Sequence, residues 1–242
     1  MESYKTNITN ITPCNICNID LFNQIIKNNN KKFIVIDGII GAGKTTFINL
    51  LIENYKKKGK KSHPIYEPVD IWKSTGALEY FYEDIPKNAY EFQTFTFITR
   101  IKRIIDEVVK NPDADYYILE RTVFTDKYIF VELLKKELGP VKMNMYNMWW
   151  NMWTMLLKNI VFDKWVLLDT SIDTSLDRIK KRNRSGEIVD ETYQRNLHKA
   201  HIDFYEKIKK EYGDNVKIIP SSLMDKNFIE DNSIINEISE LI

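Results

Sequence analysis

Residues Gly38 to Thr45 read GIIGAGKT and fit the pattern G-x-x-x-x-G-K-[ST]. The glycines let the backbone curl until successive N–H groups point at one centre, and the helix expected next adds its positive dipole end. In this pattern Lys44 reaches the β- and γ-phosphates of a nucleotide, and the hydroxyl of Thr45 ligates Mg²⁺. The sequence therefore predicts a phosphate-binding P-loop that consists of Gly38, Gly41, Ala42, Gly43, Lys44, Thr45 and Thr46.

Charged side chains follow two further predicted strands at the points where the strands end. Glu67 follows the strand expected at residues 62–66, and Glu120 and Arg121 follow the one at 116–119. Ligands of open α/β sheets bind outside the carboxyl ends of the strands, so these groups should face the P-loop. Glu67 is a candidate general base, or else a surface residue in a turn before a proline. Glu120 and Arg121 could ligate Mg²⁺ and neutralise phosphate charge, or else form a structural ion pair.

A long helix is expected from residue 89 to residue 110. Four of its side chains share one face, because they lie three, four and seven positions beyond the first. They are Gln93, Thr96, Phe97 and Arg100. Polar groups that flank a phenylalanine suit the wall of a ligand site, although a half-exposed helix face would carry the same pattern.

Three arginines precede Ser185 and Gly186, at the end of a helix expected after Asp173. They are Arg178, Arg182 and Arg184. A helix end that runs into a glycine-containing loop can bring such residues together as a lid over phosphates. A solvated helix face is the alternative, because lysine and arginine are common elsewhere in the chain.

Large apolar residues recur at spacings of three and four between residues 141 and 160. They are Met145, Met148, Trp149, Met152, Met155 and Leu156. The spacing predicts an amphipathic helix with a heavy apolar face. Such a face packs most often in a core, but it could also form a subunit interface.

Short apolar runs that suit buried strands alternate with helical segments along the chain. The predicted strands cover residues 33–36, 62–66, 116–119, 165–168 and 216–219. Because helices separate the strands throughout, the sheet should be parallel. The predicted fold is α/β, with a five-stranded parallel sheet flanked by helices and a lid segment. We assign residues 1–31 to a flexible extension with a possible short helix at 19–26, and residues 32–242 to one domain.

The composition of the 242-residue chain excludes several classes of protein. Thirty-five Lys and Arg residues against 34 Asp and Glu residues give a net charge of +1, which provides no general attraction to nucleic acid or anionic lipid. No apolar run approaches the roughly 18 residues of a membrane helix. The C-x-x-C pair Cys14 and Cys17 precedes the first strand, which is not the context of a redox motif. Without an apolar signal segment, we expect a cytoplasmic protein with neither a nucleic-acid polymer nor a membrane as partner.

Taken together, these segments resemble the deoxyribonucleoside kinase family, which includes deoxycytidine and deoxyguanosine kinases. The resemblance runs from about residue 33 to residue 201. It rests on GIIGAGKTT at 38–46, EPVDIW at 67–72, FQTFTFITR at 92–100, ERTVFTDKYIF at 120–130 and RIKKRNR at 178–184. It implies a P-loop kinase fold, ATP-dependent phosphorylation of the 5′-hydroxyl of a deoxynucleoside with Mg²⁺, and a homodimer formed through the apolar helix.

The resemblance also implies a role for each matching position. Glu67 resembles the carboxylate that accepts the proton of the 5′-hydroxyl, and Arg121 the arginine that holds that oxygen and the transferred phosphoryl group. Glu120 resembles an acidic residue beside Mg²⁺, and the three arginines resemble lid arginines. The implied catalytic residues are Glu67, Arg121, Lys44 and Arg182. The implied substrate contacts are Trp72, Tyr82, Phe92, Gln93, Thr96, Arg100, Asp126, Phe130 and Glu187, with Tyr82 and Glu187 at the 3′-hydroxyl.

The base preference follows in part from the same resemblance. Arg100 and Asp126 match the charged pair of relatives that accept deoxycytidine, deoxyguanosine or deoxyadenosine. Unpaired polar groups in a pocket reject a mismatched base, so thymidine should be a poor substrate. Thr96 stands where these relatives carry a smaller residue, and the choice between cytosine and the purines stays open.

Two other functions fit parts of the pattern. A nucleoside monophosphate kinase similar to thymidylate kinase shares the fold, but Glu-Pro-Val at 67–69 and Glu-Arg-Thr at 120–122 favour the nucleoside kinase. A non-catalytic nucleotide-binding switch would also use a P-loop. Such a switch would not require Glu67 or Gln93, and the chain lacks the Asn-Lys-x-Asp motif that recognises guanine.

Overall fold

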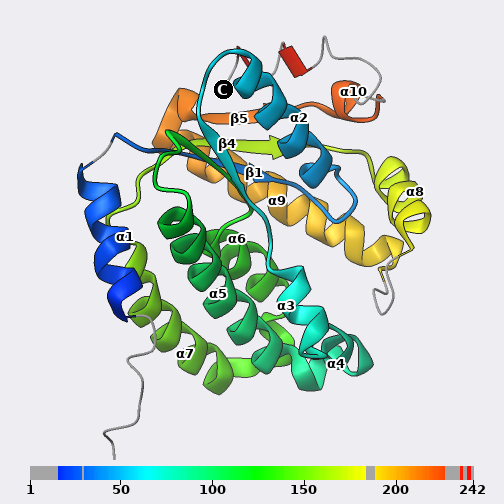
Figure 1. Ribbon diagram of the computed structural model, residues 1–242. Coiled ribbons are helices and arrows are strands. Elements are labelled where there is room, and N and C mark those ends of the chain that lie inside the picture. The colour runs from blue at the N-terminus through cyan, green and yellow to red at the C-terminus, as the bar shows by residue number, and fades with distance from the viewer. Residues whose placement is uncertain (1–15, 29, 184–188, 227–234, 237–238, 241–242) are drawn as a thin grey trace, which may run out of the picture.

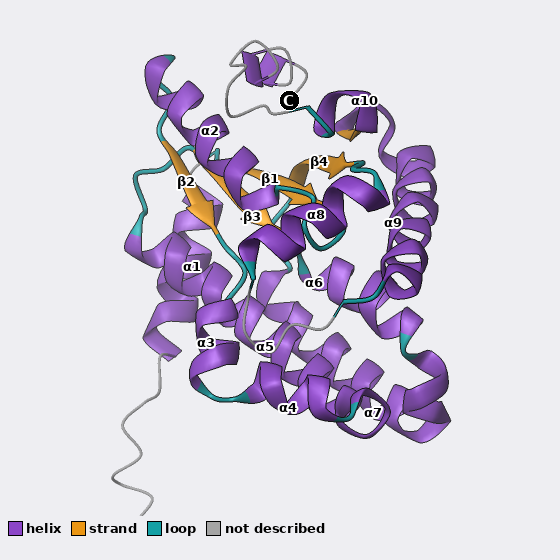
Figure 2. Cartoon of the chain, turned by 90° about the vertical axis from the view of Figure 1, so that its right-hand side faces the viewer, coloured by secondary structure: helices purple, strands orange, loops and turns teal. Residues whose placement is uncertain are grey.

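The computed structural model describes residues 16–28, 30–183, 189–226, 235–236 and 239–240. Within these ranges, five strands form one parallel sheet in the order β2, β3, β1, β4, β5 (Figures 1 and 2). The strands are β1 (Lys32–Asp37), β2 (Ser62–Ile65), β3 (Tyr116–Glu120), β4 (Phe162–Leu168) and β5 (Val216–Ile219). The predicted α/β fold with a five-stranded parallel sheet is therefore confirmed.

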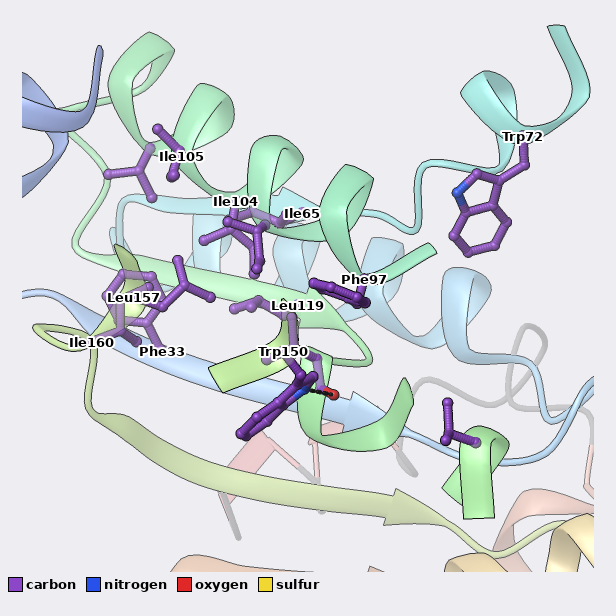
Figure 3. Close-up of a cluster of buried hydrophobic side chains, with 14 of the residues drawn as sticks. Phe33, Ile65, Trp72, Phe97, Ile104, Ile105, Leu119, Trp150, Leu157 and Ile160 are labelled. Carbon is purple, nitrogen blue, oxygen red and sulfur yellow. Dashed lines mark hydrogen bonds between the residues drawn. The ribbon is translucent and has the colours of Figure 1, made fainter. Parts of the chain in front are cut away.

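Helices cover both faces of the sheet, which explains why its strands read as nearly continuous apolar runs. Side chains of β1 alternate between the faces, and Ile34 and Ile36 pack with α2 (Lys44–Lys57). Phe33 packs in a second cluster, part of which is shown in Figure 3. That side of the sheet is covered by α1 (Ile16–Asn28), α5 (Ile85–Lys110), α7 (Lys135–Thr154) and α9 (Glu191–Tyr212).

Several shorter elements complete the described part of the chain, and most of them follow the carboxyl ends of the strands, whereas the two 3₁₀ turns precede β4 and β5. The shorter elements are α3 (Val69–Ser74), α4 (Ala77–Glu83), α6 (Val123–Thr125), a π-helical turn (Asp126–Val131), 3₁₀ turns (Met155–Leu157 and Gly213–Asn215), α8 (Ile172–Arg182) and α10 (Ser221–Met224). Among the described helices, none combines the length and the apolar character that a membrane span requires.

The long helix α5 starts before the predicted residue 89, and its capping sequence explains the difference. The side chain of Asp84 accepts a hydrogen bond from the backbone N–H of Lys87 at 3.2 Å. Pro86 follows in the first turn, where a backbone N–H would have no partner within the helix, so its absence does not destabilise the helix. The helix therefore begins at Ile85 and carries Gln93 and Arg100 in its middle.

Within the extension predicted over residues 1–31, the possible short helix at 19–26 is present and is longer than expected. Residues 16–28 form α1, which lies against α5 (Figure 1). Phe22 is fully buried in the main core, and the side chain of Asn23 accepts a hydrogen bond from Asn159 at 2.7 Å. Burial of two large apolar side chains, Phe22 and Ile25, stabilises this helix against the domain. Residues 1–15 lie outside the described part of the chain.

The methionine-rich helix α7 presents apolar side chains on two sides. Tyr146 and Trp150 face the core. Five of the six predicted apolar residues are instead exposed, namely Met145, Met148, Trp149, Met152 and Met155, and Leu156 packs partly buried against the core. The α-helix ends at Thr154, before the predicted residue 160. We call the exposed set, together with Val141, the α7 apolar face.

Candidate active site

The P-loop connects β1 to α2 and holds its shape through its glycines. Gly43 has a φ of 88° and directly precedes Lys44, the first residue of α2. Gly41 has a φ of 79°, and a Cβ atom there would lie 2.4 Å from the carbonyl oxygen of Ser175. No other residue type fits that close approach. The loop and the positive end of α2 thus have the geometry that a phosphate-binding loop requires, with Thr46 half-buried in the first helical turn.

Lys44 lies inside this loop. Its Nζ atom donates hydrogen bonds to the carbonyl oxygens of Gly38 at 3.2 Å and Ile39 at 3.0 Å. Burial and the neighbouring Arg121 lower the pKa of Lys44 to about 8. The cation is therefore poorly compensated, and a phosphate group would be a better partner than the two carbonyls.

A cavity of about 220 Å³ opens beside the P-loop. Most of the predicted substrate residues line it, and they come from α3, α4, α5 and the segments after β2 and β3. The predicted lining residues are Gly41, Lys44, Thr45, Glu67, Trp72, Tyr82, Phe92, Gln93, Thr96, Arg100, Glu120, Arg121, Asp126, Phe130 and Arg182. Residues that lie far apart in the sequence are thus assembled at the carboxyl edge of the sheet, where the parallel topology predicts a ligand.

Glu67 lies between two arginines in the lining of this cavity. Its Oε1 atom accepts hydrogen bonds from Arg100 Nη2 at 2.9 Å and from Arg121 Nη1 at 3.0 Å. Burial alone would raise the pKa of Glu67, but Arg121, Arg100 and Lys44 lower it to about 2. Glu67 is therefore ionised at neutral pH and is directed into the cavity.

Arg100 and Asp126 form a bidentate ion pair that also lines the cavity. Arg100 Nε and Nη2 donate to the two carboxylate oxygens of Asp126 at 2.8 and 3.0 Å, and Nη1 donates to the backbone carbonyl of Glu120 at 3.1 Å. Both side chains are almost fully buried. A buried pair with this many hydrogen bonds is rigid and presents fixed polar groups to a ligand.

Arg121 has a backbone conformation that is rare for a residue with a side chain. Its φ is 62°, in the left-handed region, and its N–H donates to the Ile36 carbonyl at 3.0 Å. The guanidinium donates to the Gly38 carbonyl at 2.8 Å from Nη2 and lies 4.9 Å from the ring centroid of Phe130. Strained residues that the surrounding structure holds in place are concentrated at functional sites.

Thr45 and Glu120 lie close enough to share a ligand. The Thr45 hydroxyl donates to both carboxylate oxygens of Glu120 at 3.1 Å. Burial and the nearby Glu67 raise the pKa of Glu120. The repulsion between the carboxylates of Glu120 and Glu67 would be relieved by a cation, for which the Thr45 hydroxyl offers a further oxygen ligand.

Aromatic side chains form the far wall of the cavity. Phe92 stacks on Phe81 with ring centroids 4.4 Å apart, and Trp72 meets Phe92 edge to face at 5.8 Å. The indole N–H of Trp72 donates to Thr99 at 2.9 Å, which fixes the ring. The Thr96 hydroxyl is bonded to the Gln93 carbonyl, so its position is fixed as well. A flat ring could insert between these groups, with polar atoms at its edge.

Comparison with known proteins shows to which family the chain belongs. The family model described as deoxynucleoside kinase matches residues 34–242. The chain belongs to the deoxynucleoside kinase family. It is similar to a probable deoxycytidine kinase of Fowlpox virus, with 36% identity over 70% of each chain. It is also similar to a deoxyguanosine kinase of Lactobacillus johnsonii, with 30% identity over 72% of this chain and 76% of the relative. The Homo sapiens deoxycytidine kinase is 27% identical over 70% and 74%.

Family membership makes the chain a nucleoside kinase, for which ATP is implied as the phosphate donor. The family match therefore supports a nucleoside kinase over the other two functions considered from the sequence, a nucleoside monophosphate kinase and a nucleotide-binding switch.

The two predicted lid arginines that the structure describes make contacts in different parts of the kinase. Arg182, the last residue of α8, lines the cavity. Arg178 points elsewhere and donates to the carbonyls of Ala42 at 3.2 Å and Met224 at 2.8 Å. It thus connects the P-loop to α10. Arg184 and Glu187 lie outside the described residues.

Six residues that line the cavity of the kinase were absent from the prediction. They are Ile40, Tyr66, Val69, Leu78, Phe81 and Tyr193. Tyr66 directly precedes Glu67 and donates a hydrogen bond to Asn49, so its place beside a predicted site residue was a usable signal. Phe81 belongs to a short helix without a motif, and Tyr193 comes from the first turn of α9. Burial raises the pKa of Tyr193 to about 12, so it stays a neutral hydroxyl.

Proposed function

We propose that this kinase transfers the γ-phosphoryl group of ATP to the 5′-hydroxyl of deoxycytidine or a purine deoxynucleoside in preference to thymidine. The observation that carries the proposal is the buried Arg100–Asp126 pair in the lining of a cavity that also has aromatic walls. Trp72, Phe92 and Phe130 would enclose the base, and Gln93 would bond its edge. Tyr82 would contact the sugar.

Glu67 is proposed to accept the proton of the 5′-hydroxyl. It is ionised, faces the cavity and lies beside the P-loop. Its low pKa makes it a weak base, which suits a reaction in which the phosphoryl group moves through a loose transition state and the proton leaves late.

Lys44, Arg121 and Arg182 are proposed to balance the charge of the transferred phosphoryl group. All three line the cavity. The loose transition state places negative charge on the equatorial oxygens, which fixed cations stabilise. Arg121 can do so by releasing one of its two bonds to Glu67 when the nucleoside hydroxyl arrives.

The donor set beside the P-loop fits Mg²⁺. Thr45 and Glu120 offer a hydroxyl and a carboxylate, and no group of three or more His, Cys, Asp or Glu side chains among the described residues could hold a metal ion alone. Mg²⁺ prefers such sparse sites, because it keeps several waters and binds phosphate oxygens. Bound there with the phosphates, it would supply charge neutralisation and alignment of the donor.

The first testable prediction concerns the base. Cytosine and adenine carry an amino group at the edge where thymine carries a carbonyl oxygen and a methyl group. Asp126 accepts hydrogen bonds, so it favours the amino group, and Arg100 can donate to the oxygen of guanine. Arg100 could donate to the oxygen of thymine as well, so the discrimination against thymidine rests on the 5-methyl group, which would press against these polar side chains. A kcat/KM series over the four deoxynucleosides with Mg-ATP should place thymidine last by at least about tenfold. Thymidine as the best substrate would overturn the proposed role of the pair.

A second prediction concerns assembly, which we infer from the α7 apolar face. Six large apolar side chains exposed on α7 and the 3₁₀ turn that follows it are more than an isolated surface usually carries. We therefore propose a homodimer in which this face packs against its symmetry mate.

Light scattering at micromolar concentration should give about twice the chain mass of 28.7 kDa. Met148→Glu should shift the mass towards the monomer. Asn147→Glu, on a different side of α7 that lines another groove, is the matched control and should remain dimeric. A monomeric wild-type protein would rule out this assembly.

A further inference from the structure

Asp37 is a fully buried carboxylate that the mechanism above does not use. It is the last residue of β1 and immediately precedes the P-loop. Its Oδ1 atom accepts a hydrogen bond from the N–H of Gly38 at 2.8 Å, and its Oδ2 atom accepts one from the hydroxyl of Thr125 at 2.7 Å. A buried charge persists only where its oxygens are satisfied, so Asp37 ties the start of the P-loop to the segment that follows Arg121.

His201 of α9 is a third partner of the same carboxylate. Its Nε2 atom lies 3.1 Å from Asp37 Oδ1, and its Nδ1 atom lies 2.8 Å from the carbonyl oxygen of Leu197. The carbonyl can only accept, and an ionised carboxylate can only accept. The nitrogen that faces the carboxylate, Nε2, is therefore the donor in the contact with Asp37. Burial alone would raise the pKa of Asp37, but His201, Arg121 and Thr125 hold it well below its usual range.

Arg121 approaches the same oxygen from the side of the cavity. Its Nε atom lies 3.5 Å from Asp37 Oδ1 and makes no hydrogen bond among the described residues. Its terminal nitrogens instead bond Glu67 and the Gly38 carbonyl. Three donor groups thus converge on Oδ1, of which Gly38 and His201 lie at hydrogen-bond distance and Arg121 lies slightly farther away.

We propose that His201 is a positioning residue for phosphoryl transfer, acting through Asp37 on the guanidinium of Arg121. With Gly38 and His201 occupying Oδ1, the carboxylate attracts Arg121 without drawing it into a full ion pair. The terminal nitrogens therefore stay at Glu67 and the P-loop, where the phosphoryl group is transferred. Without the His201 donor, Arg121 is expected to close on Asp37 and to withdraw from Glu67. The inference rests on the proposed catalytic role of Arg121.

Replacement of His201 by asparagine or by glutamine distinguishes the proposed hydrogen-bonding role of this side chain from its contribution to packing. The amide nitrogen of Gln reaches about as far as Nε2, whereas that of Asn reaches only about as far as Nδ1. His201→Asn should lower kcat at least about tenfold with the KM values for nucleoside and ATP changed less than about threefold. His201→Gln should recover kcat to within about threefold of wild type.

His198 provides the matched control, because it lies on the same side of α9 and pairs with Asp169 at 2.6 Å. His198→Asn removes a similar histidine–aspartate contact away from Arg121, and it should keep kcat within about twofold of wild type. Equal losses in the two Asn variants would show a general effect on α9 and would overturn the inference.

The decisive measurement is a double-mutant cycle with Arg121→Lys. If His201 acts through Arg121, adding His201→Asn to Arg121→Lys should lower kcat by less than about threefold. A full tenfold loss in that background, or wild-type kcat for His201→Asn alone, would overturn the inference. Wild-type kcat for Arg121→Lys would instead overturn the proposed role of Arg121, so the two failures are distinguishable.

Discussion

Replacing Lys44 with alanine should lower kcat/KM by about three orders of magnitude, which corresponds to about 4 kcal/mol of transition-state stabilisation. The reason is the position of its ammonium group inside the P-loop, where it bonds two carbonyl oxygens until a phosphate takes their place. Removal of that charge leaves the γ-phosphoryl group without its closest cation. Steady-state kinetics over both substrates measures the loss.

The same variant should not be less stable than the wild type. Burial and Arg121 lower the pKa of Lys44 to about 8 from 10.5. Folding therefore disfavours the charged form, and this cost is present in full below pH 8 and disappears as the pH rises towards 10.5. Thermal unfolding at neutral pH should show a midpoint equal to or above that of the wild type. Lys57→Ala, at the exposed far end of the same helix, is the control for kcat/KM and should leave it unchanged.

Glu67→Gln should lower kcat by about 10²- to 10⁴-fold, because glutamine keeps the shape of the side chain but cannot accept the 5′-hydroxyl proton. ATP binding should stay intact, since Glu67 faces the nucleoside side of the cavity. Titration calorimetry with a non-hydrolysable ATP analogue tests that half of the expectation. Glu79→Gln changes an exposed glutamate of α4 and should leave kcat unaltered.

The low pKa of Glu67 determines how protein stability and kcat/KM should depend on pH. The folded value of about 2 lies below the ordinary value of 4.5. The stability that Glu67 contributes is therefore present above pH 4.5 and is lost as the pH falls towards 2. Between about pH 5 and 8 the profile of kcat/KM should show no acid limb from this carboxylate. A near-normal kcat in Glu67→Gln would show that the proton leaves by another route.

The sequence predicted those parts of the site whose geometry is local. The P-loop follows from its glycines, because the positive φ of Gly43 and the close approach at Gly41 leave no other residue type. The position of Glu67 and Arg121 follows from the parallel sheet, since carboxyl ends of neighbouring strands meet at one edge. The fold was predictable for the same reason.

Other features depend on tertiary contacts that no motif records. Arg178 fits the arginine pattern as well as Arg182 does, yet the carbonyls of Ala42 and Met224 attract it away from the cavity. The sequence indicated a possible short helix around Phe22 but not its packing, because burial of Phe22 and Ile25 depends on contacts with α5 and the main core. The left-handed backbone conformation of Arg121 could not be predicted from the sequence. This conformation is rare in residues other than glycine, and here it depends on contacts with surrounding residues.

The strand order also has a consequence for how the chain acquires its structure. The central strand β1 pairs with β3 through Val35 and Leu119, and with β4 through Val35 and Trp165. Both pairings join segments far apart in sequence, and such topologies fold slowly. During synthesis β1 leaves the ribosome long before β4. Gly38 packs so closely on β4 that a Cβ atom would lie 2.9 Å from the Leu168 carbonyl. We therefore expect the P-loop, although it is translated early, to take its final shape only after β4 has docked.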